Sequence, residues 1–456
     1  MTTGKQLLLS ALKNEKTTRP AWLPFVGVHG GHIIGLDAQN YLTSSDSLIQ
    51  GLKKSIELYN LDGLPIVFDL QVEAEILGCE LKWDKAVPPA VVTHPLVEKN
   101  LEDLPEITAR SGRFPIITRV LDVMKKDHGT DVAFYGLICG PYTLALHLLG
   151  NDIFLAMLLE PDRVKKIVEY CAEVGKKAAD IYMNHGADVI AVVDPMTSQI
   201  SPEHFEEFVT PHVNAIFDHV RANNGLSSMF VCGDVSRNLE AMCATHADNV
   251  SVDEQISIST LRTLCKKHNK SFGGNIKLTA VLLLGDENDA KKEAINIIDD
   301  AGDQGFILAP GCDLPYDVPP ANLQAVSAMI HDPYQRDIAR QIVDKAVDKF
   351  DDVTLQNYSA SDGVVLDVIT LDSTSCAPCQ YMMEAVEKAA AASGIKVYVN
   401  EHKIKVRQGI GMMCKLGVKN LPTICINGEV KFASIIPDLK TLIGAITEAH
   451  NQMRTM

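Results

Sequence analysis

The sequence predicts an α/β protein in which a (β/α)8 barrel is followed by a second, smaller α/β domain. Residues 1 to about 335 alternate short apolar runs with long helix-like segments, as expected for repeated strand–helix units. The composition then becomes charged and polar over residues 331–361, and a compact unit follows. We therefore expect a barrel over 1–340, a connecting helix and linker over 341–361, and a second domain over 362–456. An open, doubly wound sheet is the alternative for the first domain.

The strands of the first domain are predicted from apolar runs bounded by Gly, Pro, Asn or Asp. These runs are continuous rather than alternating, which is typical of strands that are buried on both faces. Seven such runs occupy residues 63–69, 133–138, 187–193, 229–232, 249–252, 272–275 and 305–308. Helical stretches lie between them, the longest at 161–185 and 201–223.

The second domain has its own order of elements. A strand at 364–371 precedes a helix at 380–393 and a strand at 395–399. After a further helix, a strand at 423–426 runs into Asn427-Gly428, which is a strong hairpin signal. The predicted order is βαβ-α-ββ-α.

Composition excludes several classes of protein. The chain of 456 residues has 42 Lys and Arg against 58 Asp and Glu, a net charge of −16, which repels nucleic acids and anionic membranes. No apolar stretch approaches the roughly 20 residues that a membrane helix needs. The N-terminus has no stretch long enough for a signal-peptide core, so we expect the 11 cysteines to belong to a cytoplasmic protein. There, cysteines serve more often as metal ligands or redox groups than as structural disulfides.

A dithiol motif marks the second domain. Cys376-Ala-Pro-Cys379 lies between a predicted strand and a predicted helix, so the helix N-terminus would stabilise a thiolate on Cys376. Cys379 lies one helical turn later and could resolve a mixed disulfide. About 45 residues on, Pro422 precedes a strand, where a cis-proline facing the dithiol would fit.

Thr374–Cys379 and Gly417–Gly428 resemble the two signature regions of small thioredoxin-like proteins. The resemblance covers about residues 362–456. It implies catalytic roles for Cys376 and Cys379 and a binding role for Pro422. A redox-inactive adaptor that has kept its cysteines is the alternative.

Two further cysteines follow predicted strands of the first domain. Cys232 ends one strand, and Cys312 follows the last strand within Pro310-Gly311-Cys312. Catalytic groups of a barrel lie at the C-terminal ends of its strands, so the two thiols could meet at its mouth and hold Zn²⁺. Spacing alone leaves open that they are two unrelated buried cysteines.

Six stretches of the first domain form a specific pattern, and they are Phe68–Gly78, Gly140–Ala145, Gly186–Ile190, Ser201–Phe208, Gly273–Asn275 and Gly305–Pro315. Through these stretches, most of residues 1–335 resembles the uroporphyrinogen decarboxylase superfamily. The superfamily contains tetrapyrrole decarboxylases and zinc-dependent corrinoid methyltransferases. The resemblance places Cys232 and Cys312 at two zinc-ligand positions of the methyltransferases. It makes Asp69 a catalytic candidate, and we assign Tyr142 to cofactor binding.

One position departs from the methyltransferase pattern. The histidine of the His-x-Cys segment is Phe230 here, which cannot ligate a metal. Another side chain must supply the third ligand, or zinc is not bound as in the family. Candidates near predicted strand ends are Asp234, Asp194, His147 and His29.

The decarboxylase branch is disfavoured by charge. A substrate with eight carboxylates needs fixed cations, but the segment Phe25–His32, which holds arginines in that branch, contains no Arg or Lys. Asp69 does match the acidic residue that binds pyrrole N–H groups in the decarboxylases.

The methyltransferase branch is therefore the favoured interpretation. The resemblance implies methyl transfer between a corrinoid and a zinc-activated thiol or another small acceptor or donor. The cobalt-ligand signature Asp-x-His-x-x-Gly is absent, so we expect a separate corrinoid protein as partner. A homodimer is a further expectation, since barrels of this size often pair. The dithiol could keep the two cysteines reduced, exchange electrons with a partner, or carry an acceptor thiol. A thiol–disulfide oxidoreductase with the barrel as a binding module is the alternative.

Overall fold

The computed structural model describes residues 2–341, 350, 353–374, 376–418 and 420–455. They form two compact units that divide between residues 343 and 344. Much of the predicted connecting helix and linker, 341–361, lies outside the described residues. Its described part includes a turn of 3-10 helix at Tyr358–Ala360.

The first unit is built on eight parallel strands in the order β1-β10-β9-β8-β7-β6-β5-β2. The two end strands approach each other where the Asp62 N–H donates to the Trp22 carbonyl oxygen over 2.9 Å. The sheet therefore nearly closes, and the predicted (β/α)8 barrel is confirmed. The strands are β1 Ala21–Trp22, β2 Gly63–Pro65, β5 Ala133–Cys139, β6 Val189–Val193, β7 Leu226–Val231, β8 Asn249–Val252, β9 Ser271–Ile276 and β10 Phe306–Pro310.

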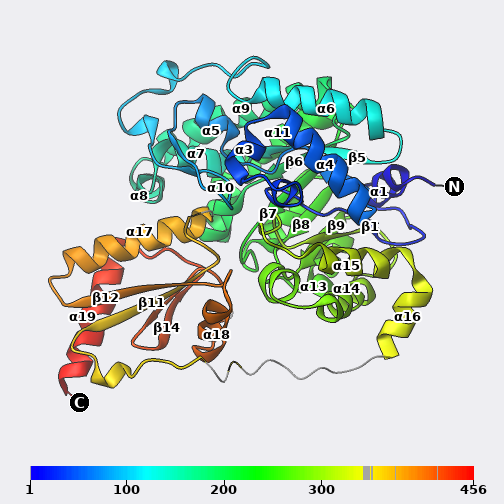
Figure 1. Ribbon diagram of the computed structural model, residues 1–456. Helices are drawn as coiled ribbons and strands as arrows, with labels where there is room; N and C mark the ends of the chain where they lie inside the picture. Colours follow the sequence, from blue (N-terminus) through cyan, green and yellow to red (C-terminus); the bar gives the residue numbers. More distant parts are fainter. Residues whose placement is uncertain (1, 342–349, 351–352, 375, 419, 456) are drawn as a thin grey trace. The chain divides into compact units, whose positions relative to one another are not determined.

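Helices surround these strands, as Figure 1 shows. The predicted helix at 201–223 is divided in two, because Pro211 has no N–H to donate to a continuous helix. The helices are α1 Gly4–Leu12, α2 His29–His32, α3 Ala38–Leu42, α4 Ser45–Tyr59, α5 Val72–Ile76, α6 Phe114–His128, α7 Pro141–Leu149, α8 Asp152–Leu159, α9 Pro161–Asn184, α10 Pro202–Phe208, α11 Thr210–Ala222, α12 Leu239–Ala244, α13 Ile258–Lys267, α14 Glu287–Ala301, α15 Pro320–His331 and α16 Pro333–Gln341. A small hairpin of β3 Leu81–Lys82 and β4 Ala90–Val91 lies outside the barrel sheet.

The short helices α7 and α8 are inserted between strand β5 and the barrel helix α9. Within the described part of the chain, no single helix has the length and apolarity to cross a membrane. The bent pair formed by α7 and α8 meets that test only when its two helices are joined.

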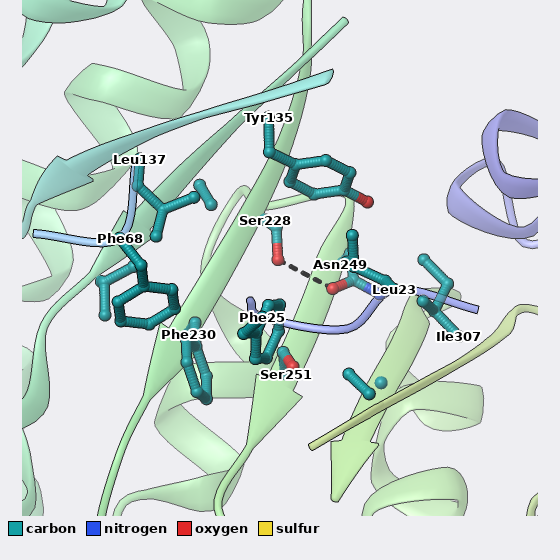
Figure 2. Close-up of a pocket in the computed structure, with 14 residues that line it drawn as sticks. Leu23, Phe25, Phe68, Tyr135, Leu137, Ser228, Phe230, Asn249, Ser251 and Ile307 are labelled. Atoms are coloured by element: carbon teal, nitrogen blue, oxygen red, sulfur yellow. Dashed lines mark hydrogen bonds between the residues drawn. The ribbon is translucent and has the colours of Figure 1, made fainter. Parts of the chain in front are cut away.

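The barrel interior is filled by side chains in two chemically different groups. Ser228 on β7 hydrogen-bonds Asn249 on β8 over 2.8 Å, and Asn249 donates to Ser271 over 2.8 Å. Beside this polar group, Phe25, Phe68 and Phe230 bring their rings together (Figure 2). The cavity that remains is about 10 Å³, which is room for about one water. The interior is therefore a packed core and not a substrate tunnel.

The second unit has a four-stranded sheet in the order β12-β11-β13-β14. Its helices α17 and α19 pack on the apolar residues of β11 and β13. Asn427 and Gly428 both have positive φ, which the predicted hairpin turn requires, and they join β13 to β14. The elements are β11 Val364–Thr370, α17 Ala377–Ala392, β12 Val397–Lys403, α18 Arg407–Lys415, β13 Thr423–Ile426, β14 Glu429–Ala433 and α19 Leu439–Thr455.

Candidate functional site

The thiols of Cys232 and Cys312 meet at the mouth of the barrel. Cys232 follows β7 directly, and Cys312 comes two residues after β10, so both lie at C-terminal strand ends. Their Sγ atoms are 2.6 Å apart, although 80 residues separate them in the sequence. Cys232 is half-buried and Cys312 is 8% exposed. The predicted convergence of these two sulfur atoms is thus present in the structure.

Two carboxylates face the thiol pair. Cys312 donates a hydrogen bond to Asp313 Oδ1 over 3.4 Å, and Asp253, at the end of β8, accepts from the Gly233 N–H over 3.0 Å. The hydrogen bond with Cys312 lowers the pKa of Cys232, but burial and these carboxylates outweigh it, so the pKa is raised. The same hydrogen bond and burial both raise the pKa of Cys312. Without a cation, both thiols therefore stay protonated at neutral pH.

An aromatic cluster lines the barrel interior near the strand that leads to Cys232. Phe230, two residues before Cys232, is 2% exposed and lines the barrel interior. Its ring centroid is 5.1 Å from that of Phe25 and 6.2 Å from that of Phe68 (Figure 2). The position that holds a zinc-binding histidine in the family thus belongs to an apolar cluster. This cluster offers no ligand.

Two of the candidate third ligands are already engaged. His29 is fully buried; its Nε2 lies 2.6 Å from the Tyr59 hydroxyl and its Nδ1 3.1 Å from the Tyr316 carbonyl oxygen. Burial lowers the pKa of His29 to about 4, so its ring is neutral at neutral pH. Asp194 accepts hydrogen bonds from the Tyr142 N–H, the Thr143 N–H and the Thr143 hydroxyl at the start of α7.

These contacts give Asp194 a structural role. Its carboxylate caps the N-terminus of α7, although burial raises its pKa to about 6. Residue 140 must be glycine for this approach, because a Cβ there would collide with the Asp194 side chain. The interpretation of Asp194 as a metal ligand is therefore not supported by its contacts.

The remaining candidates do not complete a metal site. His147 on α7 is 2% exposed, and neither of its ring nitrogens has a hydrogen-bond partner among the described residues. Asp234 accepts from the Ser236 N–H over 2.9 Å in the loop after Cys232. Across the described residues, no three His, Cys, Asp or Glu side chains are grouped closely enough to hold a metal ion. The two sulfur atoms are soft ligands of the kind that zinc binds, and a third protein ligand is not in place among the described residues.

Asp69, the predicted catalytic acid, is buried in an ion-pair cluster. Its Oδ2 is 2.6 Å from Arg113 Nη1, and its Oδ1 accepts the Gln71 N–H over 2.8 Å. Arg113 Nε also donates to Glu75 over 2.7 Å, and the guanidinium lies 5.1 Å from the centre of the Trp83 ring. Burial alone would lower the pKa of Arg113, but the two carboxylates raise it. Asp69 therefore has a permanent cation as its partner.

Glu73 is a second buried acid beside Asp69. Neither Glu73 nor Arg113 was predicted from the sequence. Its Oε1 accepts the Cys139 N–H over 3.3 Å, whereas its Oε2 has no partner within the described residues. Burial raises the pKa of Glu73 to about 7. No local pattern could have indicated the cluster, because Arg113 lies 44 positions from Asp69.

Tyr142, the predicted cofactor-binding residue, is fully buried on α7. Its hydroxyl donates to the Met157 sulfur on α8 over 3.1 Å. Tyr142 thus fastens the two inserted helices to each other. Its role in cofactor binding stays a prediction.

The dithiol of the second unit lies at the start of α17, as predicted. Cys376 and Cys379 form a disulfide. Cys376 is the N-cap of α17 and is half-buried, whereas Cys379 is fully buried. The Leu421–Pro422 peptide bond is cis. Thr423 pairs with Ile369 near the end of β11. Pro422 therefore lies at the same end of the sheet as the segment that leads from β11 to Cys376.

Comparison with known proteins agrees with both units. Residues 3–333 match the family model of uroporphyrinogen decarboxylase (URO-D), and residues 366–447 match a thioredoxin domain. A methylcobamide:CoM methyltransferase (MtbA) from Methanosarcina mazei is 30% identical over 269 residues, which are 58% of this chain and 77% of the relative. A uroporphyrinogen decarboxylase from Trichodesmium erythraeum is 23% identical over 290 residues, 62% of this chain and 80% of the relative.

A solved structure has the same fold over the barrel. A methyltransferase from Methanosarcina mazei has a TM-score of 0.68 and 25% identity, over 73% of this chain and 100% of that chain. These matches confirm the expected relationship to methyltransferases. The chain belongs to the uroporphyrinogen decarboxylase family, with a thioredoxin domain after its barrel.

Proposed function

We propose that the barrel is a corrinoid-dependent methyltransferase, which moves a methyl group between cobalt and a small thiol. The observation that carries this proposal is the 2.6 Å approach of Cys232 Sγ and Cys312 Sγ at the barrel mouth. The similarity to methylcobamide:CoM methyltransferases supports it. The corrinoid would be carried by a separate protein. The cytoplasmic location and the homodimer stay predictions.

Zinc is the cofactor that we propose for this site. Cys232 and Cys312 would hold it through sulfur, and two thiolates would bring the charge of the site near zero. Bound zinc would deprotonate a substrate thiol at neutral pH while leaving its sulfur nucleophilic. Phe230 stands where the family has a histidine, and no third protein ligand is grouped with the two sulfur atoms among the described residues. The substrate thiol would therefore be the third ligand.

The surrounding side chains have roles that follow from their contacts. In the forward direction, a thiol and methyl-cobalt(III) give a thioether, cobalt(I) and a proton. Asp313 Oδ1, which accepts from Cys312, is placed to take a proton that leaves a sulfur atom at the mouth. Phe25, Phe68 and Phe230 exclude water from below the sulfur atoms, since the interior has room for about one water.

A decarboxylase function is less consistent with the Asp69 cluster. An acid that binds pyrrole N–H groups must present its oxygens to the substrate. Here Asp69 is 4% exposed, and both its oxygens are occupied by Gln71 and Arg113. Release of carbon dioxide from a porphyrinogen would contradict this reasoning.

A thiol–disulfide oxidoreductase is the second candidate. The observation in its favour is the Cys376–Cys379 disulfide, in which Cys376 is half-buried and Cys379 is fully buried. This function predicts disulfide reduction that depends on Cys376 and no demethylation of a methylated corrinoid.

The test combines two measurements on purified protein. Methylcobalamin is incubated with a panel of small thiols, and its demethylation is followed by absorbance. Zinc is measured in the same preparation. We expect about one zinc per chain and demethylation with at least one thiol. Protein that neither contains nor takes up zinc, and that leaves methylcobalamin unchanged, would contradict the proposal.

A further inference from the structure

The spacing of the two barrel thiols fits a second chemical state. Their Sγ atoms are 2.6 Å apart. A disulfide bond has a length of about 2.05 Å. Two thiolates on one tetrahedral zinc, with bonds of about 2.3 Å, lie about 3.8 Å apart. The pair in the barrel is thus nearer to bonding distance than to the spacing of two zinc ligands.

The neighbourhood of the pair leaves the sulfur atoms facing each other. Phe230 lines the apolar barrel interior, and no third His, Cys, Asp or Glu completes a metal site within the described residues. A second pair, Cys243 and Cys265, shows the contrast. Its Sγ atoms are 3.7 Å apart, and both residues are fully buried on helices α12 and α13. The Cys232–Cys312 pair is the closer of the two, and its member Cys232 is only half-buried.

We propose that Cys232 and Cys312 form a reversible disulfide in the metal-free barrel. The oxidant is a low-molecular-weight disulfide, which takes two electrons and leaves as two thiols. The inference concerns the sulfur atoms of the proposed zinc site, but it does not require methyl transfer to occur.

The oxidation balances in two steps. The more exposed Cys232 loses its proton and attacks one sulfur of the small disulfide; a mixed disulfide forms, and one small thiolate leaves and takes up a proton. Cys312 then loses its proton and attacks the Cys232 sulfur, which releases the second small thiol. Two electrons and two protons pass from the barrel pair to the small disulfide, and an external dithiol reverses both steps.

Formation of the barrel disulfide is tested on full-length protein after removal of metal with a chelator. The protein is treated with oxidised glutathione, free thiols are blocked, and digested peptides are analysed by mass spectrometry. We expect a peptide pair linked through Cys232 and Cys312. The Cys243–Cys265 pair is the internal control and should remain unlinked. Full linkage of Cys376 to Cys379 with Cys232 and Cys312 still free would overturn the inference.

Reversibility is tested by adding dithiothreitol to the oxidised chain. The Cys232–Cys312 link should disappear, and both thiols should become available to the blocking reagent again. A link that persists would contradict the inference, whatever the result of the methylcobalamin assay.

Discussion

Replacement of Glu73 by glutamine tests the electrostatics of the buried cluster after β2. The Glu73 pKa is raised from 4.5 to about 7 because its carboxylate is buried. Between these pH values the native protein keeps a proton that the unfolded chain has lost, so the free energy of unfolding falls as the pH rises. At about 1.4 kcal/mol per pH unit, ionised Glu73 costs the native state about 3 kcal/mol above pH 7. Glutamine has no such cost.

The assay is thermal unfolding of wild type and Glu73→Gln between about pH 5 and pH 8. Of this cost, about 2.5 kcal/mol arises between pH 5 and pH 8. The Tm of the variant relative to wild type should therefore rise by roughly 5 °C over this range, at about 2 °C per kcal/mol for a domain of this size. Glu80→Gln is the matched control, since Glu80 is exposed, and its Tm difference should not change with pH. If the Tm of wild type and the Tm of Glu73→Gln changed with pH in the same way, the reasoning would be refuted.

Three further substitutions test neighbouring parts of the account. Arg113→Met leaves the buried Asp69 charge without its partner and should cost about 3–5 kcal/mol, seen as a lower Tm; an unchanged Tm would show that the ion pair is dispensable. Cys232→Ser removes a soft ligand and should reduce bound zinc to a small fraction of one per chain, as measured by metal analysis. Phe230→His restores an imidazole near the thiols and should tighten zinc binding at least about tenfold in a chelator competition. Unchanged affinity there would mean that position 230 does not reach the metal.

The sequence predicted the barrel because its strands are continuous apolar runs, and all seven predicted runs overlap barrel strands. It did not predict β1, whose two residues, Ala21 and Trp22, are too short for a periodic signal. The run at 63–69 was too long, since only Gly63–Pro65 pairs in the sheet. The hairpin at Asn427-Gly428 was confirmed, because that dipeptide determines its own backbone conformation.

The candidate site was predictable only where a motif or a strand end marked it. Cys232 and Cys312 could be found because both follow strands whose ends converge in a barrel. Arg113 could not be found, because its pairing with Asp69 depends on the path of the chain before α6. Asp194 was a metal-ligand candidate because it lies at a strand end, but from the same place its side chain caps α7.

The central claim is that sulfur at the barrel mouth promotes methyl transfer to a thiol. Its most direct measurement is a single-turnover reaction of zinc-loaded protein with ¹³C-methylcobalamin and the thiol that reacts best, with the methylated thiol detected by NMR. Wild type should produce labelled thioether, and the Cys232→Ala/Cys312→Ala double variant should produce it no faster than protein-free solution. Equal rates for the double variant and wild type would contradict the account.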